Sequence, residues 1–134
     1  MITSKVTYLG NLRNSCEHVA SGATIITDAP IDNHGQGSAF SPTDLMATSY
    51  ASCMITIIGI YCNSHGLPFE NATAEVVKIM GSEPRRIAKL EIRLNLSGNA
   101  WNEDQQKRIL AAAKACPVAK TLGDNVEVDL SYSF

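Results

Sequence analysis

The feature that most constrains the fold of this chain is a long stretch from Leu45 to about Ser64 without lysine, arginine or glutamate. Residues 41–44, Ser-Pro-Thr-Asp, predict a helix start, because serine caps, proline suits the first helical position and Asp44 can close a capping box. His-Gly-Leu-Pro at residues 65–68 ends the helix. A helix that is apolar on all sides is either a membrane span or buried. We favour burial, because hydroxyl side chains and Gly59 interrupt the apolar run.

The segments on either side of this helix predict strands. Before it, apolar and polar residues alternate as in a three-stranded meander over residues 2–8, 12–19 and 23–27, followed by a loop to Phe40. After it, residues 71–80 and 86–97 form a hairpin, residues 102–115 a helix, and residues 126–134 a last strand. The inward positions are predicted to be Ala88, Leu90, Ile92, Leu94 and Leu96 on the second hairpin strand, and Val126, Val128, Leu130, Tyr132 and Phe134 on the last strand.

The fold class is therefore α+β, with two antiparallel sheet segments around a long buried central helix, in a single domain over residues 1–134. A chain of 134 residues struggles to surround such a helix. This predicts a homodimer whose two central helices lie back to back.

Composition narrows the functional classes. A net charge of −2 offers no basic field for nucleic acid or an acidic membrane. The N-terminus has no apolar segment after a basic start, so we expect a cytoplasmic protein with four reduced cysteines. No C-x-x-C pair or close cysteine–histidine cluster is present in the sequence, which argues against a structural zinc site.

Two of the four cysteines read as packing residues. Cys62 follows Cys53 by nine positions, which places the two on opposite sides of the helix. Cys16 alternates with Leu12 and His18 on a strand, where packing is the default.

Cys116 precedes Pro117, which pushes it out of helical geometry and makes it the cap of a second short helix. The positive end of that helix would lower the pKa of its thiol. A plain helix break with an incidental cysteine is an equally good interpretation.

Cys53, in the middle of the long helix, is by default a small core residue. If it is reactive, a cation must stabilise its thiolate. Arg85, Arg86, Arg93 and Arg108 read as solvated charges. Arg13, beside the Gly10-Asn11 turn, is a further candidate, although its spacing alone favours an exposed strand charge.

Two segments together resemble the OsmC/Ohr family. Residues 40–53, Phe-Ser-Pro-Thr-Asp-Leu-Met-Ala-Thr-Ser-Tyr-Ala-Ser-Cys, are similar to the opening of the family's central helix. Residues 115–120, Ala-Cys-Pro-Val-Ala-Lys, are similar to its C-terminal Cys-Pro segment. Residues 8–13, ending in Arg13, fit less specifically, and the likeness extends over essentially the whole chain.

The resemblance implies an intertwined homodimer that reduces organic hydroperoxides with a cysteine pair. Carried onto this chain, Cys53 is the peroxidatic thiol, Cys116 the resolving thiol and Arg13 the partner of the thiolate. It implies no metal and no organic cofactor, but an external dithiol, of a lipoyl type in the family, to reset the pair. We expect a peroxide pocket lined in part by Phe40, Met46 and Tyr50, and neither nucleic acid nor membrane as a partner.

One position departs from the family. Thr43 stands where the well-studied peroxidases have a glutamate that holds the arginine, and the nearest acid is Asp44. On an ideal helix Asp44 points away from Cys53 and lies about 14 Å along the axis. Either Asp44 replaces the glutamate, or the chain belongs to a side branch with weaker or different chemistry. The alternative functions are a non-enzymatic dimer that binds a small apolar ligand or serves as a structural stress protein and, less favoured, a membrane-associated protein.

Overall fold

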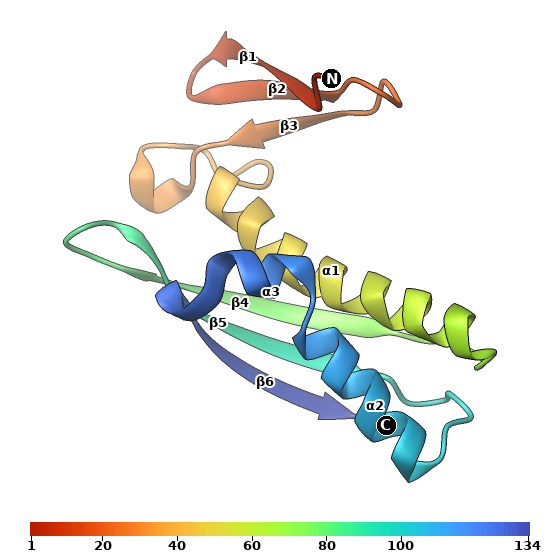
Figure 1. Cartoon of the computed structure of the whole chain (residues 1–134). Helices are drawn as coiled ribbons and strands as arrows, with labels where there is room; N and C mark the ends of the chain where they lie inside the picture. The colour runs from red at the N-terminus through yellow and green to blue at the C-terminus, as the bar shows by residue number, and fades with distance from the viewer. The chain divides into compact units, whose positions relative to one another are not determined.

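The computed structural model describes the whole chain, Met1 to Phe134, as two compact units, Met1–Met46 and Ala47–Phe134. In the first unit, β1 (Ser4–Gly10), β2 (Arg13–His18) and β3 (Thr24–Asp28) form an antiparallel meander in the order β1-β2-β3 (Figure 1). The predicted three-stranded meander is thus confirmed, with strand ends shifted by one or two residues. A single domain over residues 1–134 stays a prediction, because the two units are described separately.

The first unit has no apolar core of its own. Its buried residues are the polar Thr27, Asp28 and Ser41, and none of the buried apolar side chains of the chain belongs to it. Large apolar side chains instead stand exposed on its strands and turns, namely Val6, Tyr8, Leu9, Leu12 and Ile25. A three-stranded sheet needs a covered apolar face for independent stability, so this unit depends on a surface that covers it.

The central helix α1 (Pro42–His65) begins at the predicted proline. Ser41 and Asp44 form the predicted capping box, since the Asp44 amide donates to the Ser41 hydroxyl (3.1 Å) and the Ser41 amide donates to the Asp44 carboxylate (2.9 Å). Its buried residues recur at helical spacing: Ala47, Tyr50, Ala51, Met54, Ile58 and Cys62. One copy of the chain leaves part of the helix uncovered, with Met46 49% and Ile60 56% exposed, as expected for a helix that a 134-residue chain struggles to surround. Burial of its remaining face by a second copy stays a prediction.

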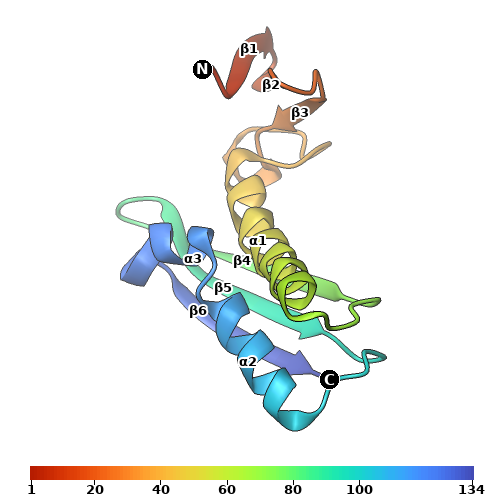
Figure 2. The ribbon, with the colours of Figure 1, turned by 45° about the vertical axis from the view of Figure 1, so that its right-hand side comes forward.

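The second unit contains β4 (Thr73–Gly81), β5 (Arg86–Asn95) and β6 (Glu127–Ser133) in the order β4-β5-β6. β4 and β5 form the predicted hairpin, but β6 runs parallel to β5, so the prediction of two wholly antiparallel sheets is wrong here. The reason is the crossover formed by α2 (Glu103–Lys114), α3 (Pro117–Leu122) and the 3₁₀ turn η2 (Gly123–Asn125). α1 and α2 cover the same face of this sheet in both views (Figures 1 and 2).

The core lies between this sheet face and the helices. Leu90, Ile92, Leu94 and Leu96 are buried as predicted, but Ile87 takes the place expected for Ala88. The register explains the difference, because Ile79 pairs with Lys89 while Met80 pairs with Ile87, which leaves Ala88 as the extra residue of a bulge.

The end of β6 also departs from its alternation. Val126, Val128 and Leu130 are half-buried and pack against the core, but Tyr132 and Phe134 stay largely exposed, contrary to prediction. Tyr132 contacts Lys114 and Phe134 meets the edge of Trp101, so both rings lie at the margin of the core on an edge strand.

Candidate functional site

Cys53 and Cys116 come together in the second unit. Cys53 lies in the middle of α1, and Cys116 lies where the chain breaks between α2 and α3 at Pro117. A hydrogen bond joins the two side chains, and both thiols are free. Cys53 is half-buried whereas Cys116 is fully buried. The two thiols are therefore neighbours in the fold, although they lie 63 residues apart in the sequence.

The local structure around Cys116 follows from Pro117. Cys116 has extended backbone angles (φ −61°, ψ 152°) and caps α3, and its sulfur accepts a hydrogen bond from the Ala119 amide (3.4 Å). The predicted cap is therefore confirmed. The Ala119 amide at this cap lowers the thiol pKa as predicted, but burial raises the pKa of Cys116 by more, and the hydrogen bond with Cys53 raises it further, so the net shift is upward. Cys116 is therefore a protonated thiol at neutral pH.

Tyr50 lies beside this pair. It precedes Cys53 by three residues on α1, and burial raises the pKa of its phenol, with the nearby Cys116 as a second cause. Together with Met54, Lys114, Val128 and Leu130, it lines a small and largely apolar pocket of about 180 Å³. The phenol thus remains a hydrogen-bond donor next to the cysteine pair over the whole neutral range.

Arg13 is the first residue of β2, in the first unit, and pairs across the sheet with Asp28. One of its terminal nitrogens, Nη2, donates to the Ser38 hydroxyl (3.4 Å), while its Nε is buried and makes no hydrogen bond. Since Arg13 belongs to the first unit and Cys53 to the second, their pairing stays a prediction.

Thr43 and Asp44 lie in the first turn of α1. The Asp44 carboxylate takes part in the capping box with Ser41, and the hydroxyls of Thr43 and Ser41 are 3.2 Å apart. These contacts fix the start of the helix that carries Cys53. The predicted pocket of Phe40, Met46 and Tyr50 draws on both units and also stays a prediction, with Phe40 and Met46 exposed and Tyr50 buried.

Asp28 and Ser38 were not singled out in the sequence. Asp28 is the last residue of β3 and is 1% exposed. Its carboxylate oxygen Oδ2 accepts hydrogen bonds from the Ser38 hydroxyl (2.6 Å) and amide (3.0 Å). These bonds, followed by the charge of Arg13, lower the pKa of Asp28 against the effect of its burial. The signal that could have revealed it is the register of the meander, which places residue 28 opposite residue 13.

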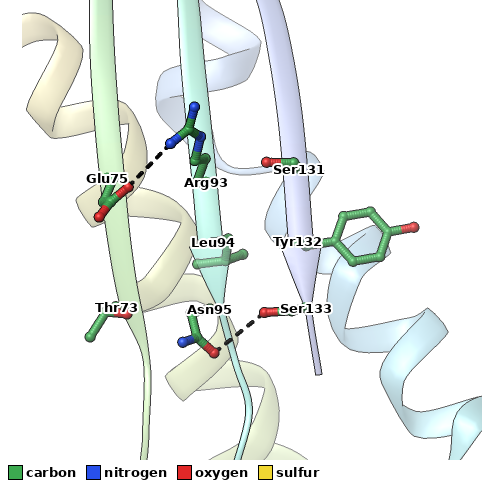
Figure 3. A pocket seen from close by; sticks show the side chains of 8 residues that line it. All are labelled: Thr73, Glu75, Arg93, Leu94, Asn95, Ser131, Tyr132 and Ser133. Atoms are coloured by element: carbon green, nitrogen blue, oxygen red, sulfur yellow. Dashed lines mark hydrogen bonds and ion pairs between the residues drawn. The ribbon is translucent and has the colours of Figure 1, made fainter.

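Other surfaces carry less chemistry. A groove of about 320 Å³ lies on the second sheet, where Glu75 and Arg93 form an exposed ion pair and Asn95 contacts Ser133 (Figure 3). It contains no cysteine and none of the predicted catalytic residues. No group of three or more histidine, cysteine, aspartate or glutamate side chains could hold a metal ion. α1 is long and apolar enough to span a membrane, but the core helix of a soluble protein passes the same test.

Comparisons with known proteins identify solved structures that are similar to this chain. No curated protein matches the sequence. A crystal structure from Psychrobacter arcticus, of a protein provisionally named as an osmotic stress induced and detoxification response protein, is 45% identical with a TM-score of 0.92, over 99% of this chain and 96% of that one. An organic hydroperoxide resistance protein OsmC from Legionella pneumophila is 21% identical with a TM-score of 0.76, over 100% and 98% of the two chains. An organic hydroperoxide resistance protein from Elizabethkingia anophelis is 17% identical with a TM-score of 0.75, over 99% and 96%.

The last two likenesses show the shared α+β fold of two small sheets and a central helix. Members of the OsmC/Ohr family are thiol-based enzymes without a cofactor. The profile of the family described as OsmC-like protein matches residues 35–131, which include both Cys53 and Cys116. With this match and the 45% identical relative, the resemblance found in the sequence is confirmed, and the chain belongs to the OsmC-like protein family.

Proposed function

We propose that this protein is a thiol-dependent peroxidase that reduces organic hydroperoxides through Cys53 and Cys116. The observation that carries the proposal is the hydrogen bond between these two side chains, which come from α1 and from the cap of α3. Membership in a family that includes organic hydroperoxide resistance proteins supports the reaction class.

The two thiols differ in a way that assigns their roles. Cys116 is fully buried, and its raised pKa keeps it protonated, so it is a poor first nucleophile. Cys53 is half-buried and is therefore the thiol that a peroxide reaches. We assign the first attack to Cys53 and the resolving step to Cys116.

The reaction balances with these two residues and an external reductant. The Cys53 thiolate attacks the terminal peroxide oxygen, the O–O bond breaks, and the alkoxide leaves as an alcohol after taking up a proton. Cys53 is then a sulfenic acid. Cys116, once deprotonated, attacks that sulfur, and the hydroxide leaves as water with a proton from solvent. A dithiol reductant, of a lipoyl type as in the family, reduces the resulting disulfide to two thiols and is itself oxidised to a disulfide.

In this proposal Arg13 stabilises the Cys53 thiolate and polarises the peroxide. Phe40, Met46 and Tyr50 contribute an apolar lining that favours organic peroxides over hydrogen peroxide. The capping box of Asp44 and the neighbouring Thr43 support the start of the helix that carries Cys53.

The working form is a homodimer in the cytoplasm. The exposed apolar side chains of the first sheet and of α1 need a cover, and a second copy supplies one of matching composition. A reducing compartment keeps all four cysteines as thiols between turnovers.

The test is to add one equivalent of cumene hydroperoxide to the reduced protein and to count free thiols over time. We expect rapid loss of two of the four thiols, mapped by mass spectrometry to Cys53 and Cys116. Cys53→Ser should abolish peroxide consumption, while Cys62→Ala, a matched change on the same helix, should leave it intact.

A non-enzymatic dimer that binds a small apolar ligand is the second candidate. The apolar pocket beside Tyr50 and the presence of Thr43 in place of the family's glutamate favour it. Four unchanged thiols after peroxide treatment would contradict the peroxidase and support this candidate.

A further inference from the structure

Arg13 faces an acid within its own sheet. The register of β2 and β3 pairs it directly with Asp28, whose side chain is 1% exposed. A buried carboxylate is costly unless opposite charge and hydrogen bonds compensate for the lost water. This pair is therefore a built feature of the first unit and differs from the exposed ion pairs of the second sheet.

Ser38 links the two side chains. Its hydroxyl donates to Asp28 Oδ2 (2.6 Å) and accepts a longer hydrogen bond from Arg13 Nη2 (3.4 Å). Backbone bonds hold Ser38 in place, because the Gly37 amide donates to the Ala29 carbonyl (3.2 Å) and the Asp28 amide to the Phe40 carbonyl (3.1 Å). The loop after β3 thus folds back so that one hydroxyl lies between the acid and the guanidinium.

The same pair retains unused polar atoms. Arg13 Nε and Asp28 Oδ1 are both buried, and neither makes a hydrogen bond. Such atoms are costly in a purely structural pair, and a functional role is one of the explanations for them. The guanidinium keeps a donor for a group outside this sheet, while Ser38 holds its other end.

We infer that Asp28, bridged by Ser38, is the carboxylate that positions the Arg13 guanidinium. From the sequence alone, Asp44 was the candidate for this role. The inference rests on the proposed function, in which Arg13 stabilises the Cys53 thiolate. Asp28 acts through Arg13 and is a positioning residue. The Asp44 carboxylate instead closes the capping box of α1.

The sign of the effect separates positioning from simple charge. Removing a carboxylate without moving Arg13 makes the surroundings more positive, which favours a thiolate and moves Cys53 reactivity to lower pH. Releasing Arg13 from its position removes the stabilising cation, which moves Cys53 reactivity to higher pH. Asp28→Asn keeps the size of the side chain and decides between these outcomes.

The experiment measures two quantities on the full-length protein: the pH at which Cys53 alkylation by iodoacetamide is half-maximal, and kcat/KM for cumene hydroperoxide at pH 7. We expect Asp28→Asn to move the alkylation midpoint up by about one unit and to lower kcat/KM about tenfold, since one pH unit is tenfold in thiolate. Asp28→Glu should recover part of the loss. Glu17→Gln, which removes an exposed carboxylate from the same strand as Arg13, should change neither quantity.

A double-mutant cycle completes the test. Arg13→Gln should shift both quantities as well, and Asp28→Asn should add nothing in the Arg13→Gln background. If Arg13→Gln raises the alkylation midpoint but Asp28→Asn leaves it in place or lowers it, the positioning role of Asp28 is wrong and the proposed peroxidase is unaffected. If Asp44→Asn raises the midpoint and Asp28→Asn does not, the positioning role belongs to Asp44. If Arg13→Gln changes nothing, the role of Arg13 in the proposed function fails and the inference fails with it. Should Asp28→Asn unfold the protein, Ser38→Ala, which keeps both charges, must give a smaller shift in the same direction.

Discussion

The resolving step should depend steeply on pH. Only a thiolate attacks the Cys53 sulfenic acid, and burial raises the pKa of Cys116 above its ordinary value of 9.0. At pH 7 and at pH 8, less than about a tenth of Cys116 is then ionised, so the thiolate fraction rises almost tenfold between these two values. The rate of disulfide formation should rise by nearly the same factor.

A single-turnover experiment measures this rate apart from the first attack. The reduced protein is mixed with one equivalent of cumene hydroperoxide, samples are quenched with dimedone, and mass spectrometry follows the ratio of trapped Cys53 sulfenic acid to the Cys53–Cys116 disulfide. The control is loss of the peroxide itself, which reports the attack by Cys53. A resolving rate that stays flat from pH 6 to pH 9 would refute the reasoning, because it would mean that Cys116 is already ionised at neutral pH.

Four further outcomes follow from the cysteine pair, the core and the helix caps. Cys116→Ser should consume one equivalent of peroxide and then stop, leaving a long-lived Cys53 sulfenic acid that dimedone traps; continued turnover with a dithiol would contradict the resolving role. Met54→Ala, at a position 1% exposed, should lower the free energy of unfolding in urea by about 2–5 kcal/mol, and Asn102→Ala, which opens the capping box of α2, by about 1 kcal/mol. Burial raises the pKa of Cys62 and Cys116 in the folded protein. The protonated thiols therefore contribute stability that is fully present below the pKa of the unfolded thiols and is lost as pH rises through the folded pKa values. The thermal midpoint of the reduced protein should accordingly fall above about pH 9. Cys62→Ala should flatten that fall, and an unchanged slope would show that Cys62 does not titrate in this range.

Much of the fold could be predicted because its signals are local. The capping box around Pro42 and the break at Pro117 both formed as the sequence indicated. The direction of β6 was missed because alternation tells which face a residue occupies and says nothing about strand direction. The helices between β5 and β6 carried that information, since only a crossover of this length joins parallel neighbours. The bulge at Ala88 had no local signal, because the alternation of apolar and polar residues along this strand includes Ala88 without a break.

The candidate site was predictable to a smaller extent. From residues alone, Cys53 and Cys116 each kept a packing interpretation, and only the resemblance to a family paired them. The net pKa shift of Cys116 was predicted with the wrong sign. The helix end that lowers this pKa is visible in the sequence at Pro117, whereas the burial that raises it comes from residues far along the chain. Local electrostatic terms can be predicted from sequence, but the desolvation that competes with them requires the packed structure.

The carboxylate opposite Arg13 could be predicted from the strand register of the meander. The family pattern directs attention to Thr43 and Asp44 at the start of α1. In a meander, however, the register of the strands determines which residues face each other. Cross-strand partners in β2 and β3 have residue numbers that add up to a constant, so that pairing Cys16 with Ile25 also pairs Arg13 with Asp28. A slip of one residue would turn every side chain of β3 to the opposite face and separate this pair. One inserted residue in the turn between His18 and Thr24 should therefore release Arg13 and raise the alkylation midpoint of Cys53 as Asp28→Asn does, with both charges still present; an unmoved midpoint in a folded insertion variant would show that Arg13 is held by something other than its register.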